Sequence, residues 1–176
     1  MSAYDLLLSY SYTSNTSSPL EITNIPQTYT DLKIILNTRS VSDPLSAAWN
    51  AYTLDFNNTG LAKFEGIYFY TSGSGNVAVG AGVSVTAYMP SSSTTASTYG
   101  GTEIYIPNYS GTSAKKSGTM KYLVENNAAG ALIGMETFSW NSTAAISSIQ
   151  LSTAAPYGNA QTAAGSKIFV YGIKNS

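Results

Sequence analysis

Apolar side chains recur at every second position along most of this chain, and this spacing limits the available folds more than any other feature. Leu32, Ile34 and Leu36 form one such series, and Ile104 and Ile106 form another. Successive side chains of a β-strand point to opposite faces of a sheet, so each series places one face against a core. No long window has the spacing of a helix. The sequence therefore predicts an all-β protein.

The strands themselves are predicted by runs of Val, Ile, Thr, Tyr and Phe, which fit a pleated, half-buried surface. Turn-forming Gly, Pro, Asn and Ser residues separate these runs. About ten strands are expected, with one or two in excess among the ranges 4–11, 19–23, 31–38, 52–56, 63–71, 76–88, 101–107, 118–125, 131–140, 146–152 and 167–173. Residues 44–50 (PLSAAWN) fit one short helical turn.

Short strands at regular spacing, joined by polar turns, indicate a β-sandwich or a barrel in a single domain of residues 1–176. The strands should be antiparallel. Nine apolar side chains in the alternating series are expected to be buried: Leu32, Ile34, Leu36, Leu54, Phe56, Ile104, Ile106, Val124 and Ile168.

Two further segments carry expectations of their own. The closing run, residues 167–173 (KIFVYGI), is too apolar to hang free, so the last strand should lie inside a sheet. The tract of residues 91–98 (SSSTTAST) has nothing to bury. It should be a mobile loop that projects from the surface.

Charge is scarce in this sequence. Only 10% of the residues are charged, with 8 basic and 9 acidic side chains, against roughly 25% in an average soluble protein. Polarity comes instead from 26 Ser and 20 Thr residues. A weakly charged polar surface suits contacts with other proteins in an assembly. Without a basic excess to neutralise phosphates, nucleic acid is not an expected partner.

No segment is predicted to cross or enter a membrane. No stretch approaches the roughly 18 apolar residues of a membrane-spanning helix. The first residues, 1–8, lack the basic start and the apolar length of a signal peptide. We therefore expect a protein that is made and folded in a cytoplasm.

Residues suited to catalysis are few. The chain has no His and no Cys, which removes the usual proton-transfer group, the commonest metal ligand and any thiolate chemistry. The nine carboxylates are scattered, although two of them could still meet across a sheet as in a glycosidase. We expect no enzyme and no cofactor.

A calcium loop is the one metal motif with a partial match. Residues 55–60 (DFNNTG) fit its first half, but Gly66 stands where the motif needs a bidentate Glu. A hairpin turn is therefore the favoured interpretation, and no metal site is predicted.

The 14 tyrosines are the remaining unusual feature. Those in alternating runs are expected to pack in the core or between the sheets, among them Tyr68, Tyr70, Tyr122 and Tyr171. Those in turns could either pack against their own loop or contact a partner, because Tyr offers a broad apolar ring and one hydroxyl. Together with the only pair of adjacent lysines, expected at a solvated loop tip, they give the candidate partner interface: Tyr99, Tyr109, Lys115, Lys116 and Tyr157.

Five short motifs carry a resemblance to a known group of proteins. They are residues 23–32 (TNIPQTYTDL), 54–58 (LDFNN), 104–109 (IYIPNY), 140–143 (WNST) and 168–174 (IFVYGIK). In this order they resemble virion structural proteins of tailed phages, notably marine and cyanobacterial phages. The resemblance implies a jelly-roll type of β-sandwich on the virion, assembled in the host cytoplasm, and it brings no catalytic residues.

Two functions follow as expectations. The first is a capsid decoration, cement or knob protein, because the strand pattern begins close to Met1 and leaves no room for a fibre shaft. Its partners would be the major capsid protein or a neighbouring structural protein, and copies of itself, with a trimer as the first expectation. The alternative is a tail-fibre head or another module that binds a host receptor or a host-surface carbohydrate, with turn tyrosines stacked on sugars.

These residues predict a stability that is insensitive to chelators and reductants. Without Cys, His or a complete calcium loop, EDTA or dithiothreitol should leave the melting temperature unchanged. Thermal unfolding measured with and without each reagent tests this. A drop of more than about 5 °C with EDTA would reveal a stabilising metal ion, since it corresponds to over about 1 kcal/mol in a domain of this size.

Overall fold

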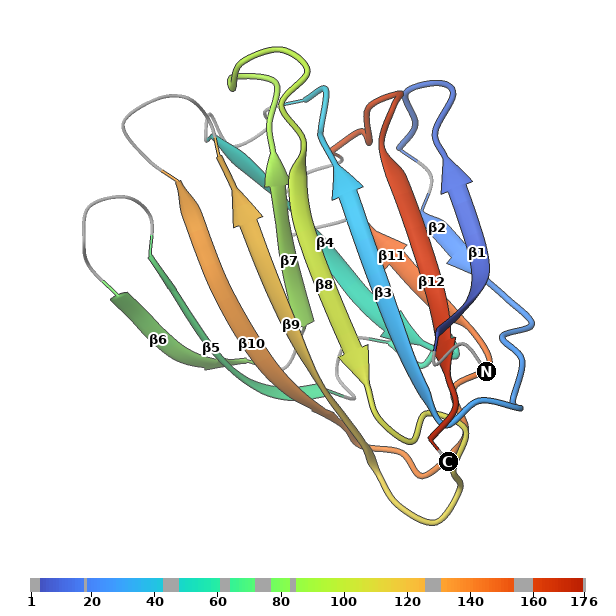
Figure 1. The fold of residues 1–176 in the computed structure, drawn as a ribbon. Helices are drawn as coiled ribbons and strands as arrows, with labels where there is room; N and C mark the ends of the chain where they lie inside the picture. Colours follow the sequence, from blue (N-terminus) through green and yellow to red (C-terminus); the bar gives the residue numbers. More distant parts are fainter. Residues whose placement is uncertain are drawn as a thin grey trace.

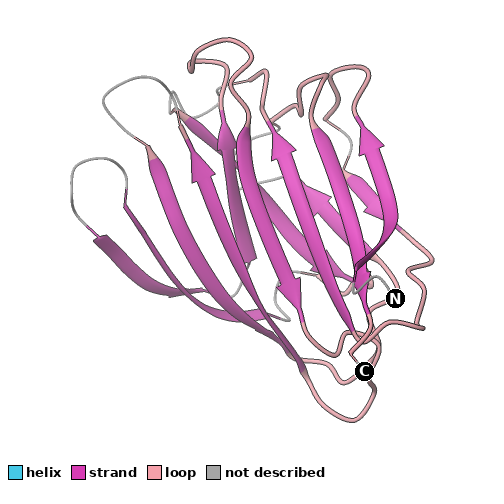
Figure 2. Ribbon diagram, in the orientation of Figure 1, coloured by secondary structure: helices cyan, strands magenta, loops and turns pink. Residues whose placement is uncertain are grey.

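The computed structural model describes residues 4–17, 19–42, 48–60, 64–71, 77–82, 85–125, 131–153 and 160–175. All regular elements in these ranges are strands (Figure 2), which confirms the all-β prediction. Accordingly, these ranges contain no helix long and apolar enough to cross a membrane.

Two antiparallel sheets pack face to face as a β-sandwich (Figure 1). The large sheet has the order β1 (Tyr4–Ser11), β12 (Lys167–Ile173), β3 (Asp31–Thr38), β8 (Gly100–Ile106), β9 (Lys116–Val124), β10 (Leu132–Trp140), β5 (Phe64–Thr71) and β6 (Val77–Gly82). The small sheet has the order β2 (Leu20–Ile22), β11 (Ile149–Ser152), β4 (Trp49–Phe56) and β7 (Val85–Pro90).

The order of the strands explains why the sheets differ in width. Eight strands divide equally between the two sheets: β1, β3, β8 and β12 lie in the large sheet, and β2, β4, β7 and β11 lie in the small one. The other four form two antiparallel hairpins, β5–β6 and β9–β10, and both lie in the large sheet. The edge strand β7 of the small sheet contacts β8, β9, β10 and β5. Beyond it, the large sheet continues as an overhang formed by β5 and β6 (Figure 1).

The strand predictions fail in two places. The expected strand 76–88 is two strands, β6 and β7, which belong to different sheets. Gly82 is the last residue of the first of them, and glycine commonly marks such a break. The helical turn expected at 44–50 is wrong for its last two residues, because Trp49 and Asn50 begin β4 and pair with Pro90 and Met89. Residues 44–47 lie outside the described residues.

The core lies between the two sheets, and all nine apolar residues expected there are buried. An aromatic cluster joins the sheets at its centre. The ring of Phe56 in β4 lies 5.9 Å from that of Phe138 and 5.6 Å from that of Trp140, both in β10. The indole N–H of Trp140 donates a hydrogen bond to Thr59 Oγ1 over 3.1 Å, so this buried ring keeps no unpaired donor.

The C-terminal strand lies inside the large sheet, as predicted. β12 pairs with β1 on one side and with β3 on the other. Its inward side chains Ile168 and Val170 are fully buried. Both edges of this strand are therefore used, and its apolar sequence is explained by the core that it covers.

The Ser/Thr tract at 91–98 is a loop, but the expectation that it buries nothing is wrong. Ser91 and Thr94 are buried, and the loop folds around the guanidinium group of Arg39. Arg39 donates hydrogen bonds to Thr94 Oγ1 (2.7 Å) and to the carbonyl oxygens of Thr94, Thr95 and Thr98 (3.1, 2.8 and 3.1 Å). A buried cation needs several acceptors, and this loop supplies them.

We predict that Arg39→Met destabilises the fold by about 3 kcal/mol, because several acceptors lose a charged donor. Urea unfolding measures the loss, and limited proteolysis should locate new cleavage at 91–98. Lys167→Met removes an exposed cation and is the matched control. A cost for Arg39→Met no larger than that of the control would show that the loop is ordered by other contacts.

Candidate functional site

The candidate interface residue Tyr109 is not available to a partner. Its side chain is fully buried, and its hydroxyl donates to the carbonyl of Pro26. Its backbone N–H donates to Thr30 O over 3.1 Å. Burial raises the pKa of Tyr109. The ring holds its own loop against the 26–30 segment, so the partner-contact interpretation is corrected for this residue.

Tyr99 is half-buried and also packs within the chain. Its hydroxyl donates to Ala164 O over 2.9 Å, and its hydroxyl end lies over Gly165, where no side chain is in the way. The third turn tyrosine, Tyr157, lies outside the described residues.

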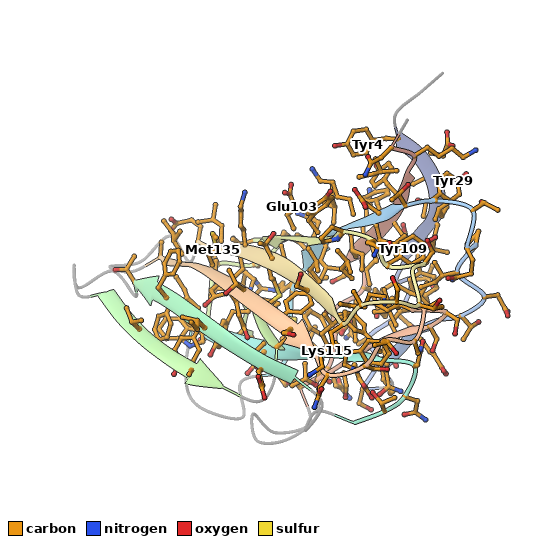
Figure 3. The ribbon with its side chains drawn as sticks, turned by 90° about the horizontal axis from the view of Figure 1, so that it is seen from below. Tyr4, Tyr29, Glu103, Tyr109, Lys115 and Met135 are labelled. Carbon is orange, nitrogen blue, oxygen red and sulfur yellow. The ribbon has the colours of Figure 1, made fainter. Side chains whose placement is uncertain are left out.

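The two adjacent lysines have different surroundings. Lys115 is exposed near one end of the sandwich (Figure 3), as expected for a loop tip. Lys116 is buried, so the expectation of a solvated side chain is wrong for it. Its ammonium group donates to Ala114 O (2.8 Å) and Thr143 O (3.1 Å), and burial lowers its pKa. Of the five predicted interface residues, Lys115 is therefore the one seen to be exposed.

The acidic side chains of two turns have structural partners. Asp55 Oδ2 accepts a hydrogen bond from the Gly60 N–H over 3.0 Å and closes the turn after β4. The hairpin expected there is wrong, because β4 and β5 belong to different sheets. Within the described residues, no three His, Cys, Asp or Glu side chains are grouped so as to hold a metal ion.

Asp31 is buried and fully engaged. Tyr105 Oη, the Asn108 N–H and Asn175 Nδ2 donate to its carboxylate over 2.6, 2.8 and 2.8 Å. Burial alone would raise the pKa of Asp31, but these three hydrogen bonds outweigh it and lower the pKa. This carboxylate fixes the ends of β3, β8 and β12 to one another and offers no free oxygen for chemistry.

An apolar surface occupies the outer face of the large sheet. Its five members, here called the outer patch, are 44% to 70% exposed: Ile67, Phe69, Val79, Leu123 and Ile133. They project from β5, β6, β9 and β10, the strands of the two hairpins. Soluble monomers rarely leave this much contiguous apolar surface uncovered, so the patch is a candidate binding surface.

The sheet is hollowed at this surface. A shallow depression of about 700 Å³ is lined by Ile35, Phe69, Leu123, Ile133 and Met135 among others. Met135 and Glu103 lie on this same outer side (Figure 3), and Glu103 forms an ion pair with Lys33 over 2.9 Å. The sequence carried a signal for the patch, because residues 64–71 (FEGIYFYT) are apolar or aromatic in both strand phases.

A second candidate site lies on the inner side, where the large sheet extends past the edge of the small one. A cavity of about 210 Å³, here called the tyrosine cavity, opens between β5, β9 and β10 on one side and β7 on the other. Its lining consists of Tyr68, Tyr70, Gly82, Thr86, Tyr88, Tyr122 and Glu136.

The four tyrosines form a continuous series. Their ring centroids are separated by 6.0 Å for Tyr68 and Tyr70, 6.4 Å for Tyr70 and Tyr88, and 5.2 Å for Tyr88 and Tyr122. Glycines make room for two of the rings. A Cβ atom at Gly134 would collide with the Tyr122 ring, and one at Gly80 would collide with the Tyr68 hydroxyl.

Glu136 supplies the charge of the cavity. Its side chain is only 3% exposed, and Oε2 accepts a hydrogen bond from the Thr86 N–H over 3.2 Å. Oε1 is buried without a hydrogen-bond partner among the described residues. Burial raises the pKa of Glu136 to about 7, although the Thr86 hydrogen bond acts in the opposite direction.

The packing predicted for these tyrosines from the sequence is only partly correct. Tyr122 is buried and Tyr70 packs between the sheets against Tyr88, as predicted, while Tyr68 is half-buried at the cavity. Tyr171 is half-buried on the outward side of β12, so its expected place in the core is wrong. Glu136 was missed as a candidate, although it shares its strand phase with the buried Phe138. A carboxylate in phase with core residues was the available signal.

Comparison of the chain with protein-family models, with curated proteins and with solved structures gave no match.

We predict that Glu136→Gln stabilises the protein at pH 8 but not at pH 4. The raised pKa means that the folded state binds the proton more tightly than the unfolded state. The stability contributed by the protonated form is therefore lost as the pH rises from about 4.5 to about 7. Gln does not titrate, so the variant should gain roughly 3 kcal/mol over wild type at pH 8.

Chemical denaturation at both pH values measures this difference. Glu65→Gln removes an exposed carboxylate from the neighbouring strand and is the control. An equal effect of Glu136→Gln at pH 4 and pH 8 would mean that the Glu136 carboxylate is not desolvated.

Proposed function

We propose that this chain is a structural protein of a tailed-phage particle, of the decoration, cement or knob type, with a binding rather than a catalytic role. The outer patch is the observation that carries the proposal, because five exposed apolar side chains on one sheet face need a protein partner to exclude water. With a net charge of −1, little electrostatic repulsion opposes close packing of many copies.

The strand order supports a jelly-roll type of sandwich. Without the two hairpins, the sheets have the orders β1-β12-β3-β8 and β2-β11-β4-β7, and successive strands enter opposite sheets except for β4 and β7, which are neighbours in the small sheet. A jelly roll consists of eight strands in two such sheets and occurs in viral capsid domains and in lectins. This fold is compatible with both functions expected from the sequence, so the choice between them rests on the surfaces.

The partner that the surfaces favour is another copy of this chain, within an assembly on the particle. Exposed apolar side chains lie at both ends of the large sheet. The outer patch is at one end, and Tyr4 and Leu6 of β1 are at the other. Because these two surfaces differ, contact between them would be head to tail and could close into a ring. A trimer, the first expectation from the sequence, would be one such ring, with the capsid protein as the next partner.

The carbohydrate- or receptor-binding alternative has lost part of its support. It relied on turn tyrosines, but Tyr109 is buried and Tyr99 is bonded to Ala164. The observation that still favours it is the tyrosine cavity, where aromatic rings and a carboxylate lie together. Binding of host-surface glycans by the isolated protein, in a glycan array, would support this alternative.

We predict that the protein forms oligomers that persist in about 1 M salt, where the Debye length is roughly 3 Å and surface ion pairs are screened. Light scattering at low and high salt measures the mass. Ile133→Lys places a charge in the outer patch and should yield monomers. Asn37→Lys adds the same charge at an exposed outer-face position of β3 and should leave the mass unchanged.

The stoichiometry of the chain in purified particles completes the test. A value near that of the major capsid protein is expected for a decoration protein. A monodisperse wild-type monomer that is also absent from particles would overturn the proposal. Dissociation by salt would show that the protein assembles, but it would contradict an apolar contact between the copies.

A further inference from the structure

We infer that the tyrosine cavity is a binding site for a small organic ammonium ion, with the carboxylate of Glu136 as its counter-ion. The inference does not depend on the proposed virion role. It rests on the charge, walls, size and accessibility of the cavity.

The charge of the cavity is negative and uncompensated. Among the described residues that line the cavity, Glu136 is the only ionisable group besides the tyrosines, and none is Lys or Arg. One of its oxygens accepts a hydrogen bond from the edge strand β7, but buried Oε1 has no partner among the described residues. A desolvated carboxylate in this state favours either a proton or a cation that donates hydrogen bonds. An ammonium group supplies both the charge and the N–H donors.

The walls suit the same class of ligand. Four tyrosines line the cavity, at ring separations of 5.2 to 6.4 Å along the series. Cations are attracted to the π systems of aromatic rings, and aromatic cages are a recurring solution for ammonium recognition. A neutral sugar could also donate to Glu136 Oε1, but it would leave the carboxylate without a countercharge. The ammonium ion is therefore the better match.

The size and position of the cavity limit how large a ligand can be and how it can enter. A cavity of about 150 Å³ holds one benzene molecule, whereas sites for drug-sized ligands begin at about 300 Å³. The tyrosine cavity, at about 210 Å³, therefore fits an ammonium head group and a short alkyl chain. It lies beside β7, the edge strand of the small sheet, and its lining residues Tyr68 and Tyr70 are half-buried, so their side chains keep some contact with solvent.

Two sources could present this chemistry. One is the ε-ammonium group of a lysine on a partner protein, and the other is a quaternary ammonium group of a small molecule. Both need the same carboxylate and the same rings. Butylammonium reproduces the lysine side chain and tetramethylammonium reproduces the quaternary group, so the two probes distinguish the sources.

The experiment is isothermal titration calorimetry of the full chain with butylammonium, tetramethylammonium, 1-butanol and glucose. At pH 8 we expect at least one ammonium ion to bind with a Kd of about 1 mM or tighter, and neither neutral compound to bind. Because a proton competes for Glu136, the affinity should fall about tenfold for each pH unit below 7. Titrations in buffers of different ionisation enthalpy should detect the released proton.

Variants separate the site from its surroundings. Glu136→Gln should weaken ammonium binding more than tenfold while retaining the strand spectrum in circular dichroism. Tyr70→Leu removes one half-buried ring and should weaken binding several-fold. Glu65→Gln removes the same charge from an exposed position and should leave the affinity unchanged.

Tighter binding of butylammonium would assign the site to a partner lysine, and tighter binding of tetramethylammonium would assign it to a quaternary ligand. The inference is overturned if neither ion binds with a Kd below about 10 mM. It is also overturned if folded Glu136→Gln binds as tightly as wild type, or if glucose binds and the ammonium ions do not.

Discussion

The two sheets of this sandwich are of unequal width, and much of the molecule is a response to that mismatch. Four strands cannot cover the inner face of eight. Where they do cover it, the inward side chains are apolar, as with Phe56, Phe138 and Trp140. At the overhang the inner face instead carries Tyr68 and Tyr70, whose rings tolerate partial burial and whose hydroxyl groups tolerate water. The core therefore changes from fully buried apolar side chains between the sheets to half-buried tyrosines at the overhang.

The same mismatch leaves β7 as a free edge of the small sheet beneath the large one. Its Thr86 N–H points away from β4, and Glu136 of β10 accepts it over 3.2 Å. An unpaired strand edge invites pairing with other chains, and an inward charge is one of the ways in which proteins blunt it. Here the blunting has a cost, because the carboxylate is desolvated and its pKa rises to about 7. One side chain thus both caps the edge and leaves an unsatisfied charge in the tyrosine cavity.

Much of this fold could be read from the sequence, and the failures have identifiable physical causes. Period-two alternation placed most strands within a few residues and all nine expected core residues, because alternation directly reports which face is buried. It could not show that residues 76–88 change sheets, because apolar residues continue at the odd positions through both strands, although Val79 is exposed and Val85 and Ala87 are buried. It also could not show that the 91–98 loop folds around Arg39, a contact between segments more than 50 residues apart.

The candidate sites were harder to predict for a related reason. Exposure of a turn tyrosine is decided by which distant backbone it meets, and Tyr109 meets the carbonyl of Pro26, 83 residues away in the sequence. Strand phase, by contrast, carries a signal for residues that the predictions missed. Glu136 lies in phase with Phe138, and Phe69 lies out of phase with Tyr68 and Tyr70.

Both candidate surfaces belong mainly to the two hairpins that widen the large sheet. On β5, Ile67 and Phe69 contribute to the outer patch, while Tyr68 and Tyr70 line the tyrosine cavity on the opposite face. The other eight strands supply four strands to each layer, so the two hairpins are not needed to form the sandwich. The hairpins carry apolar side chains on their outer face, and aromatic side chains with a carboxylate on their inner face. Binding of the proposed partners best explains both sets. A partner that covers the outer patch would press on the same strands that form one wall of the cavity.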